Sequence, residues 1–332
     1  MQKRKLGKTG LEVSPVGFGG WAIGGPFRLD GLPDGWGEVD DAESIRAIGR
    51  ALELGVDFFD TADAYGTGHG EEILGRALRG RRHEAVIATK FGFTYDARSR
   101  SVFTKADVSP EYIRSACEAS LRRLGTDYID LYQIHPGDIP YEQFDSVIDA
   151  LEGLRDEGWI RAYGWSTDNA KKAEPFARRS SCAAIQHPFN VLVGHSDMVR
   201  VCERYGMSSI NNAPLAMGLL SGKFGRTSVL PPDDVRGSSH EWVTYFKNGK
   251  PLPEYLDALE AIRAILTSGG RSLVQGALAW IWGQSRVTIP IPGLKTVAQV
   301  EEAAGAMRFG PLTPRQMTEI EEIRKSRLGL PT

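Results

Sequence analysis

The sequence predicts an α/β fold, a (β/α)8 barrel, in a single domain over residues 1–332 with long loops at the C-terminal ends of the strands. Short apolar runs alternate with amphipathic segments of helical length, and this alternation indicates parallel strands. Eight such units fit in the chain, and 332 residues lie within the usual range for a barrel. No linker or low-complexity stretch divides the chain, which favours one domain.

The predicted strands are short apolar runs. They lie near 16–18, 58–59, 86–89, 129–134, 162–166, 184–187, 207–211 and 287–291. The predicted helices lie near 41–54, 71–79, 110–124, 142–157, 169–179, 196–205, 253–267 and 272–283, with a C-terminal helix or tail over 310–332. Ser109-Pro110-Glu111 is a typical helix start, with a capping residue followed by proline at the first helical position.

A doubly wound sheet is the competing fold. It requires a glycine-rich turn that leads directly from the first strand into a helix. Gly17-Phe18-Gly19-Gly20 supplies glycines, but roughly 20 loop-like residues follow, so this fold is not favoured.

One region of the chain has no clear periodicity. Residues 223–252 contain Pro231-Pro232, Gly237 and Asn248-Gly249. Loops of this length are usually either functional or disordered. We predict a mobile flap over the top of the barrel; a loop without function is the alternative.

The composition excludes several classes of protein. The net charge of −2 argues against a nucleic-acid partner. No stretch approaches the ~20 apolar residues of a membrane helix, and the basic start at residues 1–7 leads into no apolar run, so neither a membrane span nor a signal peptide is predicted. Cys117, Cys182 and Cys202 are widely spaced and read as reduced thiols without a metal site. We expect a cytoplasmic protein; a homo-oligomer stays open.

Ionisable residues end three successive predicted strands. Asp60 follows Phe58-Phe59, Lys90 ends the next run, His135 ends the third, and Tyr65 lies five residues after Asp60. Each residue alone has an ordinary interpretation as a cap, a packing residue or a solvated charge. Because the C-terminal ends of barrel strands meet at the active-site face, we predict that all four converge.

Together these side chains suit proton transfer. Tyrosine, with a pKa near ~10, is a weak acid at neutral pH. An ammonium group ~4 Å away contributes at most ~4 kcal/mol, or up to ~3 pKa units, at an effective dielectric constant of ~20. We therefore expect Lys90 to lower the pKa of Tyr65, Asp60 to hold Lys90, and His135 to bind a substrate carbonyl oxygen. With no activated nucleophile in the pattern, carbonyl reduction is predicted, and it needs a hydride source.

Motifs along nearly the whole chain resemble those of the aldo-keto reductases, in the bacterial branch near the potassium-channel β-subunits. These motifs are Asp60-Thr61-Ala62-x-x-Tyr65-Gly66, Thr89-Lys90, Asp130-Leu131-Tyr132-Gln133-Ile134-His135, Gly164-x-Ser166, Pro214-Leu215-Ala216-x-Gly218 and Ile289-Pro290-Ile291-Pro292-Gly293. The resemblance implies that Tyr65 is the proton donor of a tetrad with Asp60, Lys90 and His135. The sequence departs from the family pattern at Trp165, Thr167, Asn212 and Ala303.

The resemblance also implies a set of cofactor-binding residues. These residues are Gly20, Trp21, Ser166, Gln186, Asn212, Leu215, Gly218, Lys223, Gly293, Lys295, Gln299 and Glu302. Ser166 and Gln186 would hold the nicotinamide carboxamide. Lys295 suits the 2′-phosphate of NADP, which favours NADP(H), with NAD as an alternative. Lys295 has a second interpretation as a cap for the helix that starts near Thr296.

The predicted function is an NADP(H)-dependent reductase of aldehydes or ketones. Two alternatives stay open: a nucleotide-sensing binding subunit with little turnover, and a dehydrogenase that oxidises a sugar or polyol. A pocket rimmed by Trp21, Trp165 and Trp242 would suit an aryl or hydrophobic carbonyl compound. His240 in the flap either contacts the substrate or is a solvated loop histidine.

Overall fold

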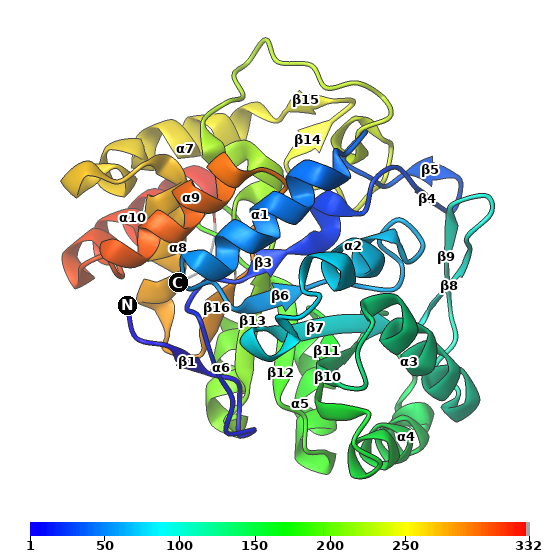
Figure 1. Ribbon diagram of the computed structural model, residues 1–332. Helices are drawn as coiled ribbons and strands as arrows, with labels where there is room; N and C mark the ends of the chain where they lie inside the picture. The colour runs from blue at the N-terminus through cyan, green and yellow to red at the C-terminus, as the bar shows by residue number, and fades with distance from the viewer. Residues whose placement is uncertain (195, 330–332) are drawn as a thin grey trace.

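A closed parallel β-barrel forms the centre of the computed structural model, which describes residues 1–194 and 196–329 (Figure 1). Its strands, in order around the sheet, are β3 (Phe18–Gly19), β6 (Phe58–Asp60), β7 (Val86–Phe91), β10 (Ile129–Ile134), β11 (Ile160–Ser166), β12 (Ala184–Pro188), β13 (Ser208–Asn212) and β16 (Thr288–Pro290). The amides of Gly17 and Gly19 donate to the carbonyls of Pro290 and Pro292 at 2.9 Å, and these bonds close the barrel. The predicted (β/α)8 fold is confirmed.

Helices surround the barrel (Figure 1). They are α1 (Asp41–Glu53), α2 (His69–Ala77), α3 (Pro110–Leu124), α4 (Phe144–Asp156), α5 (Ala170–Arg179), α6 (Asp197–Tyr205), α7 (Pro253–Leu266), α8 (Leu273–Gln284), α9 (Val297–Gly305) and α10 (Pro314–Leu328). Ser109 caps α3 as predicted. Helix α10 lies within the predicted 310–332 segment, of which residues 330–332 fall outside the described part. Within the described residues, no helix is both long and apolar enough to cross a membrane.

A hairpin closes the N-terminal end of the barrel. Strands β1 (Arg4–Lys5) and β2 (Glu12–Val13) pair antiparallel, and the Gly7 amide donates to Ser208 Oγ at 2.8 Å. Leu6 and Val13 are fully buried against the apolar residues that fill this end of the barrel interior. Because this end is plugged, a ligand reaches the interior only from the opposite end, where the ionisable strand ends lie.

A small side sheet, which the sequence did not predict, stands beside the C-terminal end of the barrel. It contains β4 (Arg28–Leu29), β5 (Leu32–Pro33), β8 (Phe93–Asp96) and β9 (Ser101–Ala106), in the order β5-β4-β9-β8. Two of these strands have only two residues, too few to show an alternating pattern. The sheet joins segments about 70 residues apart in sequence through Arg28, whose amide donates to the Arg100 carbonyl at 2.9 Å.

The segment 223–252 lies over the C-terminal end of the barrel (Figure 1) and contributes residues to the cavity there. It carries the short pair β14 (Phe246–Lys247) and β15 (Lys250–Pro251). The Val235 amide donates to the Gly35 carbonyl at 2.9 Å, and both Val235 and Phe246 are buried. The segment is therefore packed onto the loop that contains Gly35. Its mobility stays a prediction.

A buried histidine on β12 makes stability depend on pH. His187 Nε2 lies 2.8 Å from Ser209 Oγ, and burial lowers the pKa of His187 from 6.5 to about 4. Between these pH values the unfolded chain takes up a proton that the folded protein excludes. On lowering the pH from about 7 to about 4, the wild type should lose up to about 3 kcal/mol of unfolding free energy relative to His187→Gln. Urea denaturation of both proteins across this range measures the difference, and a pH-independent difference would contradict the assignment.

Candidate active site

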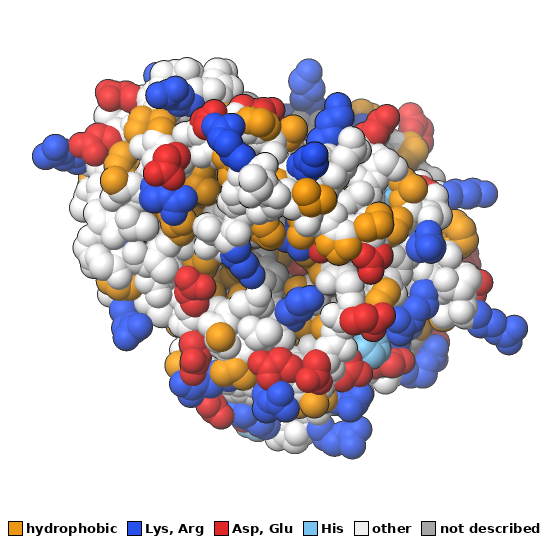
Figure 2. All heavy atoms as spheres, turned by 90° about the horizontal axis from the view of Figure 1, so that it is seen from above, with side chains coloured by type: hydrophobic (Ala, Val, Ile, Leu, Met, Phe, Trp, Pro, Cys, Tyr) orange, Lys and Arg blue, Asp and Glu red, His pale blue; other side chains and the backbone are white. Residues whose placement is uncertain are grey.

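A cavity of about 630 Å³ opens at the C-terminal end of the barrel. Its walls come from the strand ends, from the side sheet and from the 223–252 segment. The face seen in Figure 2 is hollowed near its centre, with hydrophobic side chains in the hollow and Lys or Arg side chains near its edge. This volume lies within the usual range for a small-molecule site.

Three of the four predicted catalytic residues form a hydrogen-bonded cluster. Lys90 Nζ donates to Asp60 Oδ2 at 2.7 Å and to the Tyr65 hydroxyl at 3.1 Å. It also donates to the Thr61 carbonyl at 2.8 Å. Because Lys90 is fully buried and Asp60 is only 3% exposed, this is an ion pair shielded from water. The geometry fits the predicted arrangement, in which Lys90 is hydrogen-bonded to Asp60 on one side and to Tyr65 on the other.

The neighbouring strands fix the Asp60 carboxylate. Its Oδ1 accepts from Gln133 Nε2 at 3.2 Å and from Gln186 Nε2 at 2.7 Å. Asp60, Gln133 and Gln186 come from β6, β10 and β12 and are all buried. Both carboxylate oxygens therefore have partners, so the negative charge beside Lys90 is held in one orientation.

The predicted downward shift of the Tyr65 pKa is wrong for this arrangement of the site. The pKa of Tyr65 is raised above 10, because burial disfavours the phenolate more than Lys90 favours it. The charge of Lys90 lowers the pKa of Tyr65, as predicted, but the effect of burial is larger. The pKa of Lys90 is also raised, because the attraction of Asp60 and Tyr65 exceeds the cost of its burial. At neutral pH the cluster therefore contains a neutral phenol, which still carries its proton, beside a charged ammonium.

The fourth residue, His135, lies next to Tyr65 at the cavity wall. The two rings meet edge to face with centroids 5.7 Å apart, and Phe93 packs on His135 at 4.8 Å. Burial, assisted by the charge of Lys90, lowers the pKa of His135 well below 6.5. A neutral imidazole beside the tyrosine hydroxyl can donate one hydrogen bond to a substrate oxygen without acting as an acid.

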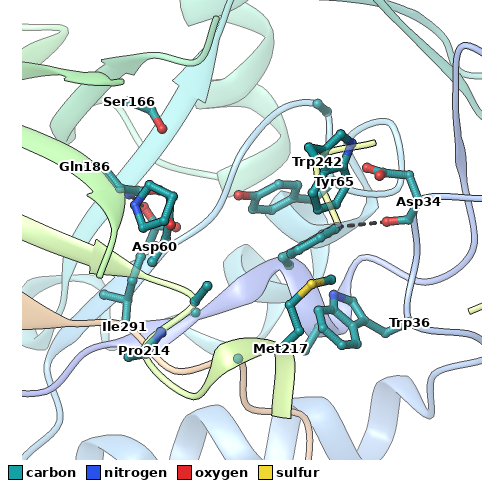
Figure 3. A pocket seen from close by; sticks show the side chains of 18 of the residues that line it. Asp34, Trp36, Asp60, Tyr65, Ser166, Gln186, Pro214, Met217, Trp242 and Ile291 are labelled. Atoms are coloured by element: carbon teal, nitrogen blue, oxygen red, sulfur yellow. Dashed lines mark hydrogen bonds between the residues drawn. The ribbon is translucent and has the colours of Figure 1, made fainter. Parts of the chain in front are cut away.

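Most of the predicted cofactor-binding residues line the cavity. The lining includes Trp21, Ser166, Gln186, Asn212, Leu215, Gly218, Lys223, Gly293, Lys295 and Gln299. Gly20 is buried beside the lining, and Glu302 is exposed on α9; neither lines the cavity. Figure 3 shows Ser166 and Gln186 on the same side of the cavity as Asp60. Gln186 already donates to Asp60, so one group of its amide is engaged.

Three cationic side chains gather at one part of the cavity. Lys223, Arg236 and Lys295 all line it. Arg236 is paired with Asp234, whereas Lys223 forms no ion pair within residues 1–194 and 196–329. Burial, together with repulsion from Arg236 and Lys223, lowers the pKa of Lys295, and the attraction of Asp234 opposes this shift. A bound anion would relieve that repulsion, so this region suits the phosphates of a dinucleotide.

Lys295 does not cap the following helix through its side chain. Thr296 caps α9, whereas Lys295 Nζ donates to the Trp36 carbonyl at 3.1 Å. The Gln299 side chain accepts from the Lys295 amide at 2.9 Å, which fixes the backbone at this point. The ammonium of Lys295 is thus held at the cavity wall, as a phosphate ligand requires.

One predicted pocket residue lies elsewhere. Trp165 is completely buried, donates to the Pro136 carbonyl at 2.8 Å and packs on Phe144 and Phe176, so its role as a pocket rim is wrong. Successive strand residues face opposite sides, and Ser166 takes the cavity side. Trp21 and Trp242 do line the cavity. The solvated alternative for His240 is also wrong, since its side chain is only 7% exposed.

Several cavity residues had no signal in the sequence. They are Phe27, Leu29, Asp34, Trp36, Phe93, Val102, Thr104 and Arg236. They lie in loops, in the short strands of the side sheet or, for Arg236, in the single 3-10 turn Val235–Gly237, where no periodicity marks one face. The aromatic content of residues 27–36 is the one pattern that could have indicated a pocket wall.

The family model described as the Aldo/keto reductase family matches residues 15–325, and the chain therefore belongs to this family of oxidoreductases. It is 30% identical to the aldo-keto reductase yakc [NADP(+)] of Schizosaccharomyces pombe, over 96% of this chain and 90% of that protein. It is 31% identical to the NADH-specific methylglyoxal reductase of Escherichia coli, over 98% and 99%. Among solved structures, the glycerol dehydrogenase AKR11B4 of Gluconobacter oxydans superposes with a TM-score of 0.83 at 31% identity, covering 99% of this chain and 97% of that one.

Proposed function

We propose that the protein is an NADP(H)-dependent reductase of aldehydes or ketones, with Tyr65 as the proton donor. The observation that carries the proposal is the Asp60–Lys90–Tyr65 hydrogen-bonded chain at the wall of a cavity that also holds cationic side chains. A nicotinamide cofactor bound in this cavity would supply the hydride. A carbonyl oxygen placed between Tyr65 and His135 would receive hydrogen bonds from both.

The charge state of each of the four residues determines the role that we propose for it. The neutral His135 donates its single N–H to the carbonyl oxygen and polarises it, while its lowered pKa leaves the ring without the second, acidic proton at neutral pH. Tyr65 donates its proton as negative charge develops on that oxygen. Lys90, 3.1 Å from the Tyr65 hydroxyl, stabilises the phenolate that remains. Asp60 keeps Lys90 protonated and aimed at Tyr65.

The same site can run in the oxidative direction, with Tyr65 accepting the proton. The 31% identical glycerol dehydrogenase supports a test with alcohols as well as with carbonyl compounds. The tetrad geometry is common to both directions, so cofactor ratio and substrate decide between them. A binding subunit without turnover is not favoured, because the hydrogen-bonded Asp60, Lys90 and Tyr65 with His135 beside them support a catalytic role.

Cofactor preference depends on Lys295 and Lys223. The relatives differ in the cofactor that their names give, because one is named for NADP(+) and another as NADH-specific. We favour NADP(H) because the cationic group described above suits a 2′-phosphate. The roles proposed for Ser166 and Gln186 at the nicotinamide depend on the same binding mode.

Replacing Lys295 with alanine should raise the KM for NADPH about tenfold or more and leave the KM for NADH nearly unchanged. A charge-assisted hydrogen bond contributes about 1.5–3 kcal/mol, and only NADPH carries the 2′-phosphate. Initial rates with a good aldehyde at varied NADPH and varied NADH concentrations measure the two KM values. Lys247→Ala, an exposed lysine on β14, is the matched control. Equal effects on the two cofactors would contradict the assignment to the 2′-phosphate.

A further inference from the structure

The outer part of the cavity contains a buried carboxyl group without a hydrogen-bond partner. Asp34 lines the cavity and is 7% exposed. Its Oδ1 accepts no hydrogen bond within the described residues. Burial raises the pKa of Asp34 well above 3.8, which favours the neutral carboxyl. A buried polar group without a partner costs free energy, so its presence at a ligand cavity suggests that the ligand supplies the partner.

A second polar group without a partner lies beside it. His240 Nε2 is 3.4 Å from Asp34 Oδ1, and within the described residues it forms no aligned hydrogen bond. Burial lowers the pKa of His240, so the ring is neutral, with one nitrogen as donor and the other as acceptor. Asp34 comes from the loop before α1 and His240 from the 223–252 segment. The two chain segments together therefore create a pair of polar groups at the cavity.

Aromatic rings connect this pair to the catalytic tyrosine. The centroid of Trp21 lies 6.2 Å from that of Tyr65 and 5.8 Å from that of Trp242, and Trp242 stacks on His240 at 5.3 Å. Trp21 Nε1 donates to the Asp34 backbone carbonyl at 3.0 Å, which fixes the carboxyl relative to the rings. Figure 3 shows the Asp34 side chain directed to the side of the cavity on which Trp242 lies. A substrate whose carbonyl lies at Tyr65 would thus extend along flat apolar rings towards Asp34.

We propose that Asp34, with His240 beside it, recognises a hydroxyl group of the substrate, so that the enzyme prefers carbonyl compounds with a hydroxyl group several bonds from the reacting carbon. This inference rests on the proposed function. A hydroxyl group both donates and accepts, and so can satisfy a carboxyl and an imidazole at once. A cationic group would need an ionised carboxylate, which burial at this position disfavours. A purely apolar substrate would leave Asp34 without a partner, and sites that bind a hydroxyl discriminate strongly against analogues without one.

Matched substrate pairs test the inference. The pairs are 4-(hydroxymethyl)benzaldehyde with 4-methylbenzaldehyde and the corresponding 3-substituted compounds. We expect the wild type to show a kcat/KM about tenfold or more higher for the hydroxylated member of at least one pair. Asp34→Leu should abolish that preference while retaining turnover of the apolar member. Asp34→Asn, whose amide still donates and accepts, should retain part of it.

Two controls separate the possible results. Glu38→Leu changes an exposed carboxylate in the same loop and should leave every ratio unchanged. His240→Phe keeps an aromatic ring against Trp242 and should reduce the preference for the hydroxylated substrate. It therefore provides a second test if the Asp34→Leu protein does not fold. Absence of a preference in the wild type, or an equal loss for both members of each pair in Asp34→Leu, would overturn the inference while the reductase function stands. Absence of NADPH-dependent turnover with every aldehyde would instead contradict the proposed function, and this inference with it.

Discussion

Replacement of Tyr65 by phenylalanine is expected to lower kcat for aldehyde reduction about a hundredfold to ten-thousandfold, the usual contribution of a positioned general acid. The substitution removes only the hydroxyl, which is 3.1 Å from Lys90 Nζ. The aromatic ring and its contacts with Trp21 and His135 remain. Steady-state NADPH consumption measures kcat, and nucleotide fluorescence measures cofactor affinity, which should change little.

Tyr141→Phe is the control for this experiment. Tyr141 is 46% exposed in the short helical turn before α4, and its hydroxyl donates to the Lys171 carbonyl at 3.4 Å. Its kcat should equal that of the wild type. Wild-type turnover in Tyr65→Phe would show that another group donates the proton, and the mechanism proposed above would then be wrong.

Replacement of Lys90 by methionine should reduce both activity and stability. The fully buried ammonium is the partner of Asp60 and stabilises the phenolate of Tyr65. Removal of one member of a buried ion pair typically costs about 3–5 kcal/mol, because the other charge stays buried without compensation. Urea denaturation and the rate of NADPH consumption measure the two losses.

A double variant distinguishes the two roles of Lys90. Asp60→Asn with Lys90→Met removes both charges, so part of the lost stability should return because no uncompensated charge is buried. Activity should not return, since nothing stabilises the phenolate. Lys105→Met, an exposed lysine on β9, should change neither quantity. A stable, active Lys90→Met protein would contradict the roles proposed for this ion pair.

The barrel and the position of the proposed catalytic residues could be predicted because strand periodicity and strand ends are visible in the sequence. Asp60, Lys90 and His135 each end or follow an apolar run, and parallel strands bring such positions to one face. Trp165 shows the limit of a prediction made without following side-chain alternation. It precedes Ser166 on β11 and therefore points to the helices rather than to the cavity.

The outer wall of the cavity could not be predicted, because it depends on contacts between loops. The Val235 amide donates to the Gly35 carbonyl, which joins segments 200 residues apart and brings Arg236 and Asp34 to one cavity. No local pattern encodes such a contact. The direction of the Tyr65 pKa shift could not be predicted from the sequence either, because it depends on how deeply the side chain is buried, which only the folded structure gives.

The central claim is direct hydride transfer to a carbonyl group in this cavity. The most direct measurement uses NADPH deuterated at the transferring position of nicotinamide C4, a panel of aldehydes and ketones at neutral pH, and mass spectrometry of the products. We expect an alcohol with one deuterium on the former carbonyl carbon, formed in step with NADPH consumption. Bound nucleotide without alcohol formation from any substrate in the panel would contradict the reductase assignment.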